Sequence, residues 1–196
     1  MDIKDILTEI SDGNPTPGGG AVGWIVWGQG TGLLRMVSNL TLKSNKWADG
    51  HNSAESIISK TAGFEGIAIN GYNQDCEAYD TVVDAYRLDK KDPMRRGAIE
   101  SASVFAAEVP LALVSKVLEI SKMHSDLVGK HNRNAHSDLM VSKHLLATAS
   151  IIGAYNVTAN LPEIPEDKRM IIQSNLTVKM KEIENMLSIT LDWSEG

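Results

Sequence analysis

A short loop, Pro15-Thr16-Pro17-Gly18-Gly19-Gly20, constrains this chain more than any other stretch, because an apolar helical pattern begins directly after it. The prolines fix φ and remove backbone donors, whereas the glycines can take conformations closed to other residues. At the start of a helix the first N–H groups lack intrahelical partners and carry the positive end of the helix dipole. A glycine-lined entry therefore lets a carboxylate or oxyanion approach bare backbone. The alternative is a plain connector, since the loop matches neither common phosphate-binding glycine motif.

The length and charge of the chain limit what it can be. Its 196 residues suit one domain, 1–196, with a substantial core. The net charge of -6 argues against binding to nucleic acid or to a membrane surface, because both require a basic face. Cys76 is the only cysteine, which excludes an intrachain disulfide and makes the reducing cytoplasm the expected setting. The longest apolar region, about 21–37, is interrupted by Gln29, Thr31 and Arg35, so it predicts a core helix.

Apolar residues recur at helical spacing along nearly the whole chain, and no strand-like alternation of useful length occurs. Helices are predicted over about 3–10, 18–42, 53–88, 93–128, 135–157 and 166–191. Pro110 is expected to kink or interrupt the fourth of them. The predicted fold is all-α, an antiparallel multi-helix bundle. The second helix carries more apolar and glycine surface than a monomeric bundle readily covers, so a homodimer is also predicted.

Two stretches combine residues that can carry chemistry. Tyr72, Asp75 and Tyr79 share a helix face, where Asp75 could act as a general acid or base between aromatic walls. The alternative is a surface acid beside half-buried tyrosines. The segment Asn132–Asp138 brings amides, an imidazole and a carboxylate to a loop-to-helix junction. The alternative there is a capping arrangement in which Asp138 complements the helix dipole.

The histidines do not predict a metal site. His124, His131, His136 and His144 lack the i, i+4 spacing of a helical ligand pair, and no H-E-x-x-H motif occurs. Basic residues gather in three places, of which Lys43 with Lys46 is one. A basic cluster beside the glycine loop would favour a polycarboxylate ligand.

Six stretches together resemble the formiminotetrahydrofolate cyclodeaminase and methenyltetrahydrofolate cyclohydrolase family. In family order they are Pro15–Val22, Met36–Thr41, Asp75–Tyr79 with Ala85, Ala106–Leu111, Asn132–Asn134 with Ser137 and Asp138, and Asn156-Val157 with Asn160-Leu161. They cover the chain from about residue 3 to beyond residue 165. The resemblance implies an all-helical, homodimeric enzyme that acts on the one-carbon unit of tetrahydrofolate.

The resemblance also implies where the folate binds. The glycine loop, the Asn39 region and the Asn132–Asp138 junction are expected to line the site. Predicted substrate-binding residues are Thr16, Pro17, Gly18, Gly19, Gly20, Asn39, Lys46, Asn132 and Asn134. For proton transfer, or for stabilising a cation, Asp138 ranks first, Asp75 second and His136 third. No cofactor is expected, because a tetrahydrofolate derivative is itself the substrate, and a separate formiminotransferase partner would be its source.

Three functions stay open at this point. In the first, N10 of 5-formiminotetrahydrofolate attacks the formimino carbon and ammonia leaves, giving 5,10-methenyltetrahydrofolate. In the second, a cyclohydrolase adds water to the methenyl bridge and forms 10-formyltetrahydrofolate. Both reactions occur at one carbon, so the residues do not separate them. The third is a non-catalytic folate-binding or scaffold protein, which the altered helix after Trp24 would permit.

Overall fold

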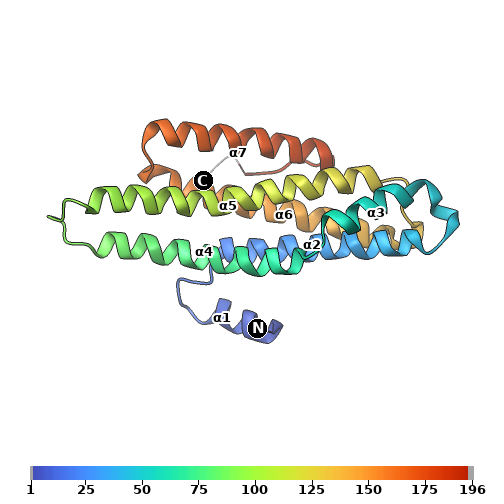
Figure 1. Ribbon diagram of the computed structural model, residues 1–196, viewed down its shortest axis with the longest axis horizontal. Helices are drawn as coiled ribbons and strands as arrows, with labels where there is room; N and C mark the ends of the chain where they lie inside the picture. Colours follow the sequence, from blue (N-terminus) through green and yellow to red (C-terminus); the bar gives the residue numbers. More distant parts are fainter. Residues whose placement is uncertain (1, 194–196) are drawn as a thin grey trace.

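The computed structural model describes residues 2–193, which form helices and connecting loops without a β-strand in that range (Figure 1). The α-helices are α1 (Ile3–Ser11), α2 (Gly19–Leu42), α3 (His51–Lys60), α4 (Phe64–Arg87), α5 (Arg95–Leu127), α6 (His136–Asn160) and α7 (Glu166–Leu187). Short 3-10 helices cover Asn45–Gly50, Arg133–Ala135 and Leu161–Glu163. The prediction of an all-α bundle is confirmed.

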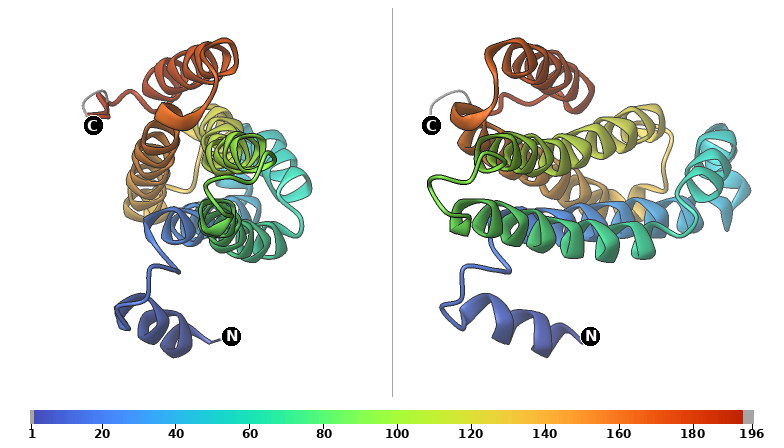
Figure 2. Two further views of the ribbon diagram at one scale, coloured as in Figure 1. Left: turned by 90° about the vertical axis from the view of Figure 1, so that its left-hand side faces the viewer. Right: turned by 60° about the vertical axis from the view of Figure 1, so that its left-hand side comes forward.

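The long helices α2, α4, α5 and α6 form the bundle, and chain neighbours in it run antiparallel (Figure 1). In the end view of Figure 2, α2 and α6 lie side by side on one side, and α4 and α5 lie on the other. Helix α7 covers α5 and α6, while α1 stands beyond α2 and buries none of its residues. The side chains of Trp27, Leu34, Leu113, Leu139 and Leu146 are fully buried between the helices.

Glycines on α2 allow its neighbours to approach closely. A Cβ atom on Gly23 would lie 2.8 Å from Leu113 of α5 and 2.7 Å from Ile152 of α6, both closer than carbon atoms pack. Two turns further on, the Ser142 hydroxyl donates a hydrogen bond of 2.7 Å to the Gly30 carbonyl oxygen. The glycines that weaken α2 as an isolated helix are therefore what lets it pack closely against α5 and α6.

The predicted helix over 53–88 is wrong at one place. The chain forms two helices there, because α3 ends at Lys60 and α4 begins only at Phe64. Gly63 has φ of 72° between them, a left-handed conformation that glycine adopts without a steric penalty. The helical periodicity continues across the break, and Gly63 is the residue that could have indicated it.

Pro110 does not interrupt α5, which is continuous from Arg95 to Leu127. A proline cannot donate to the carbonyl oxygen four residues earlier, so the Ala106 oxygen loses its intrahelical partner. The side-chain amide of Asn160, on α6, donates a hydrogen bond of 3.0 Å to that oxygen. The break is avoided because a neighbouring helix satisfies the group that the proline leaves free.

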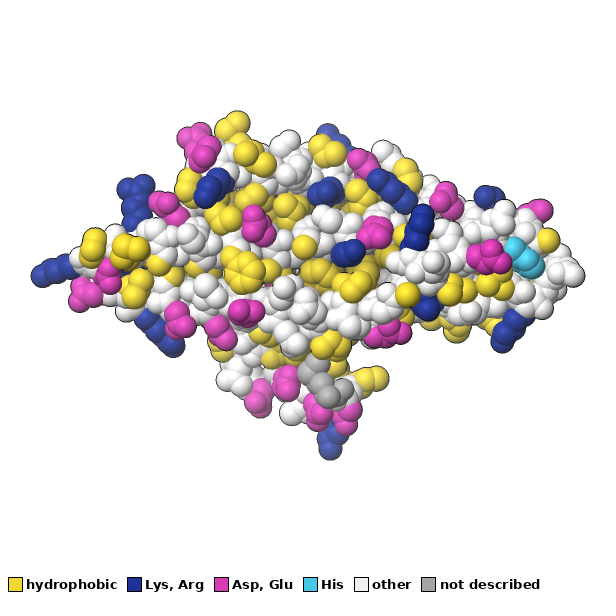
Figure 3. Space-filling view, in the orientation of Figure 1, with side chains coloured by type: hydrophobic (Ala, Val, Ile, Leu, Met, Phe, Trp, Pro, Cys, Tyr) yellow, Lys and Arg dark blue, Asp and Glu magenta, His cyan; other side chains and the backbone are white. Residues whose placement is uncertain are grey.

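Within residues 2–193, one helix is long and apolar enough to cross a membrane by length and composition. It is α5, in which an 18-residue stretch has a mean hydropathy of 1.5, and 56% of that stretch is buried inside the bundle. Core helices of soluble proteins reach similar values. On the face seen in Figure 3, acidic and basic side chains are interspersed, and no large region of that face is purely basic.

Candidate functional site

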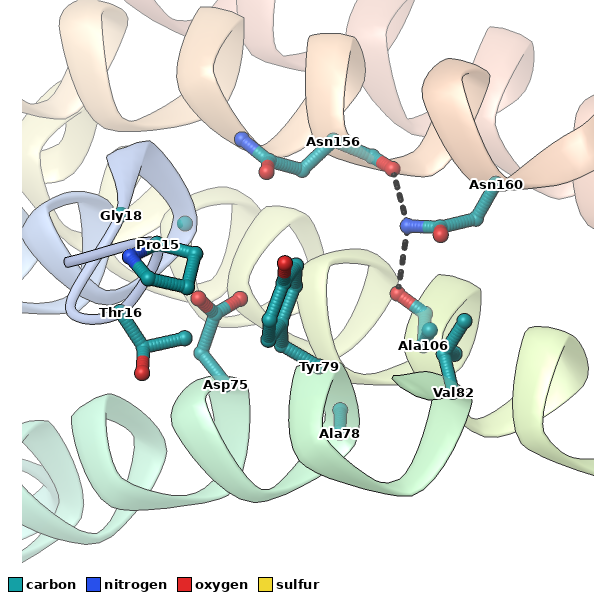
Figure 4. Close-up of a pocket in the computed structure, with 11 residues that line it drawn as sticks. Pro15, Thr16, Gly18, Asp75, Ala78, Tyr79, Val82, Ala106, Asn156 and Asn160 are labelled. Carbon is teal, nitrogen blue, oxygen red and sulfur yellow. Dashed lines mark hydrogen bonds between the residues drawn. The ribbon is translucent and has the colours of Figure 1, made fainter. Parts of the chain in front are cut away.

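A cavity of about 260 Å³ lies where the glycine loop meets α4, α5 and α6 (Figure 4). Helix α4 contributes one wall, α6 contributes the wall across from it, and the glycine loop closes one end beside Asp75. The lining residues are Pro15, Thr16, Gly18, Gly20, Asp75, Ala78, Tyr79, Val82, Ala106, Asn156 and Asn160. Among the residues described, no lysine, arginine or histidine lines this cavity.

Asp75 lies against the start of α2, and its carboxylate points into the cavity (Figure 4). Gly20 faces it directly, and a Cβ atom at position 20 would overlap the carboxylate. The backbone N–H of Ala21, in the first turn of α2, forms a hydrogen bond with Asp75. The glycine loop thus serves to bring the helix terminus up to the carboxylate, which explains why a glycine occupies position 20.

The pKa of Asp75 is raised above the usual value of an aspartic acid. Its largest cause is burial, which disfavours the charged form, and the hydrogen bond from Ala21 lowers the pKa by a smaller amount. A carboxyl group that faces a cavity and has a raised pKa is suited to accept and return a proton at a pH above the usual range of an aspartic acid. Tyr79 stands beside it and is 41% exposed, so the predicted face of α4 is only partly buried.

Two asparagines complete the cavity opposite Asp75. The Asn156 side chain donates a hydrogen bond of 2.8 Å to the carbonyl oxygen of Ile152, one turn earlier on α6. The Asn160 side chain donates to the carbonyl oxygens of Ala106 and Asn156 (Figure 4). In the sequence, both asparagines stand out only as part of the resemblance. Their spacing of one turn, together with Pro110, is the signal that could have identified them.

The glycine loop and Asp75 account for one part of the predicted site. Thr16, Gly18 and Gly20 line the cavity, and a cis peptide bond joins Thr16 to Pro17. A Cβ atom on Gly19 would lie 3.9 Å from the Asn156 side-chain nitrogen, so this residue also borders the cavity.

The other predicted residues lie together at the opposite end of α2. The Asn132 backbone N–H donates to the Thr41 hydroxyl at 3.0 Å, and its side chain donates to the Leu40 carbonyl oxygen at 3.1 Å. Its side-chain oxygen accepts from the Asn134 N–H at 3.0 Å. Asn132 therefore ties the junction before α6 to the end of α2.

Side chains around this junction have local partners. Asn39 donates to the Arg35 carbonyl oxygen at 3.0 Å, and the Lys46 ammonium lies 5.0 Å from the centre of the Trp47 ring. His136 contacts the buried His131, with ring nitrogens 3.1 Å apart. Burial, followed by the charges of His136 and Arg133, lowers the pKa of His131. Asp138 occupies the first turn of α6, where it complements the helix dipole.

Within one chain the two groups of predicted residues cannot touch one small molecule. Gly20 lies in the first group and Leu40 lies beside the second. They are twenty residues apart on α2, and at about 1.5 Å of helix rise per residue this separates them by about 30 Å. Asp75 and the glycine loop share a cavity, whereas Asp138 and His136 lie at the other end of the bundle. Among the described residues, no three histidine, cysteine or acidic side chains gather as metal ligands do.

Comparisons with known proteins agree on one family. Methenyltetrahydrofolate cyclohydrolase of Methylorubrum extorquens is 28% identical over 95% of this chain and 88% of its own length. Formimidoyltransferase-cyclodeaminase of Sus scrofa is 23% identical over 99% of this chain, which spans only 37% of that longer protein. The crystal structure of formiminotetrahydrofolate cyclodeaminase from Thermotoga maritima has a TM-score of 0.80, with 23% identity and 96% of each chain covered, which shows the shared fold.

The sequence model of one family covers most of the chain. The formiminotransferase-cyclodeaminase model matches residues 2–180, a range that includes the glycine loop, Asp75 and both cavity asparagines. This chain therefore belongs to the formiminotransferase-cyclodeaminase family.

Proposed function

We propose that the protein is a formiminotetrahydrofolate cyclodeaminase. The observation that supports this most is the chemical character of the cavity, which offers a carboxylate and amide oxygens and no basic side chain among the lining residues. Such a cavity favours a ligand that carries positive charge and N–H donors. The formimino group of 5-formiminotetrahydrofolate is an amidine, and its protonated form has both properties.

Asp75 is the proposed proton-transfer residue. As N10 attacks the formimino carbon, N10 becomes more acidic and loses its proton to the carboxylate. The carboxyl group then returns this proton to the departing nitrogen, so that ammonia leaves and the methenyl bridge forms. The reaction changes no oxidation state, so it requires no redox cofactor. The cavity contributes by holding N10 near the reacting carbon, which lowers the entropic part of the activation barrier.

Cyclohydrolase activity is the second candidate. The relative from Methylorubrum extorquens, which matches this chain along most of its own length, is named a methenyltetrahydrofolate cyclohydrolase. In that reaction Asp75 would instead remove a proton from the attacking water. The substrate again carries positive charge, so the same cavity suits it.

The purified protein should be assayed with 5-formiminotetrahydrofolate and, separately, with 5,10-methenyltetrahydrofolate. We expect ammonia release together with methenyl absorbance in the first assay, because the cavity suits an amidine that bears N–H groups. Loss of methenyl absorbance in the second assay alone would instead identify a cyclohydrolase. If neither substrate turns over and tetrahydrofolate gives no saturable heat in calorimetry, the enzyme proposal fails and a non-catalytic scaffold remains.

We further propose that the protein is a homodimer joined along α2. Val22, Val26, Gln29, Leu33, Met36 and Leu40 recur at alternating spacings of four and three residues, and none of these side chains is fully buried. This is the spacing of a helix-to-helix seam. If α2 pairs with the partner's α2 in antiparallel fashion, the Asn132–Asp138 junction of one copy approaches the cavity of the other. Both groups of predicted site residues would then face one substrate.

Light scattering tests the dimer. We expect a mass near twice the 21.3 kDa of one chain, and we expect Leu33→Asp to shift the mass towards that of a monomer, since a charge in an apolar seam is costly. Val178→Asp is the matched control, because Val178 is 54% exposed on α7, away from the seam. A wild-type mass of one chain at micromolar concentration would contradict the dimer.

The substrate source and the compartment complete the proposal. A separate formiminotransferase would supply the formimino substrate, since the longer relatives are named formimidoyltransferase-cyclodeaminases and this chain spans about a third of their length. Histidine degradation is the process in which such a formimino group would arise. The single cysteine is compatible with the cytoplasm as the working compartment.

A further inference from the structure

We infer that Asn156 and Asn160 form a fixed pair of hydrogen-bond acceptors that binds an amidine-type group of the substrate, meaning a planar N–C–N group that bears N–H donors. This inference rests on the proposed function and assigns specificity-determining residues within the same cavity. It follows from which atoms of the two side chains are already occupied by the protein.

Asn160 has no free donor left. A side-chain amide carries two N–H groups and one oxygen. The Asn160 nitrogen donates to the Ala106 carbonyl oxygen at 3.0 Å and to the Asn156 carbonyl oxygen at 2.8 Å. The first of these bonds replaces the one that Pro110 cannot make, so turning the amide over would leave the Ala106 oxygen without a donor. The side-chain oxygen of Asn160 is therefore held in one orientation, and no described residue donates to it.

Asn156 is oriented by its own helix. Its side-chain nitrogen donates at 2.8 Å to the Ile152 carbonyl oxygen, and this leaves the side-chain oxygen on the cavity side, facing Asp75 (Figure 4). No described residue donates to this oxygen either. Two amide oxygens one helical turn apart, about 6 Å along α6, thus stand opposite a carboxylate. All three groups accept hydrogen bonds when Asp75 is ionised.

An acceptor set of this kind selects by leaving polar groups unpaired when the wrong ligand enters. A ligand with two adjacent N–H groups satisfies it, whereas a ligand that presents oxygen acceptors is repelled. Two parts of the proposed substrate have the required chemistry. One is the protonated formimino group, and the other is the edge of the pyrimidine ring with its amino group.

Two variants separate a binding role from a structural role. Asn160→Leu removes an acceptor but also the bond between α5 and α6, so the fold of that variant must be checked by its melting temperature. Asn156→Leu removes an acceptor and only a bond within α6. Thr158→Val is the matched control, because the Thr158 hydroxyl donates to the Ala154 carbonyl oxygen at 2.9 Å on the same helix and does not line the cavity.

The measurements are the Kd of tetrahydrofolate by calorimetry and kcat and KM with 5-formiminotetrahydrofolate. We expect Asn156→Leu to weaken binding of at least one of these ligands by about tenfold or more, the effect of one lost hydrogen bond to a charged donor, with the control unchanged. If the amides hold the formimino group, KM rises and the Kd of tetrahydrofolate stays constant. If they hold the pyrimidine edge, both rise together. Constants within twofold of wild type for Asn156→Leu, in a wild-type protein that does turn over substrate, would overturn the inference and leave the proposed function standing.

Discussion

Replacing Asp75 by asparagine is expected to lower kcat with 5-formiminotetrahydrofolate by about 100-fold to 1,000-fold, because an amide can neither accept nor return a proton. The fold should be retained, since asparagine has the size of aspartate and its oxygen can still accept the hydrogen bond from Ala21. A change confined to kcat would identify a role in the transition state rather than in binding. The measurement is kcat and KM of purified Asp75→Asn compared with those of the wild-type protein.

The pKa of Asp75 adds an expectation about stability. Burial raises this pKa in the folded chain, so between the ordinary value and the raised value the folded state binds more protons than the unfolded state. Stability due to this group therefore falls as the pH rises through that window, and the ionised carboxylate is a cost at neutral pH. At pH 7, Asp75→Asn should therefore melt at the same temperature as wild type or higher. Wild-type activity should fall as the pH is lowered through the pKa of Asp75, and this fall should begin at a higher pH than for an ordinary aspartate.

Asp138→Asn is the comparison variant. The resemblance favours Asp138 as the proton-transfer residue, whereas the cavity geometry favours Asp75. Within its own chain Asp138 lies in the first turn of α6, and an asparagine there loses only the interaction of a charge with the helix dipole, worth about 0.3–1 kcal/mol. Turnover within about tenfold of wild type is expected. A larger loss for Asp138→Asn than for Asp75→Asn would restore the original order and would mean that Asp138, which the proposed dimer brings towards the partner's cavity, transfers the proton in place of Asp75.

Local patterns predicted the helices well where packing agrees with periodicity. The loop before α2 and the first residue of α7 are predicted from the sequence, whereas α7 ends at Leu187 and not at the predicted residue 191. Pro110 is the instructive exception, because its effect depends on Asn160, which lies 50 residues later in the chain. The sequence around a proline indicates its effect on its own helix. It does not show that another helix supplies a hydrogen-bond donor to the carbonyl oxygen that the proline leaves free.

The candidate site shows the same limit. Residue types and the resemblance identified the glycine loop and Asp75, and the structure brings them into one cavity. The resemblance also grouped Asn132 and Asp138 with them, although these residues lie at the other end of α2 within one chain. The helix predicted over about 18–42 already implies this separation, because Gly20 and Asn39 lie near its two ends. The asparagines at 156 and 160 gained a specific interpretation only from the partners of their nitrogen atoms.

Replacing Gly20 by alanine is expected to lower turnover by about 100-fold while keeping the protein folded. The added Cβ would overlap the Asp75 carboxylate, which must then rotate away from the cavity. Alanine is a better helix former than glycine by about 1 kcal/mol, which offsets part of the steric cost in the folded state. Gly66→Ala is the control, because a Cβ at that position of α4 meets no atom within 4 Å, and it should leave kcat unchanged.

The double variant shows whether Gly20 acts through Asp75. If alanine at position 20 impairs catalysis only by displacing the carboxylate, then adding it to Asp75→Asn should lower kcat by less than about threefold further, since the group it displaces no longer transfers a proton. Independent effects would multiply instead, and the double variant would fall by the product of the two single losses. A multiplicative result would mean that the glycine loop contributes to catalysis by contacting the substrate itself, through the backbone N–H groups at the start of α2.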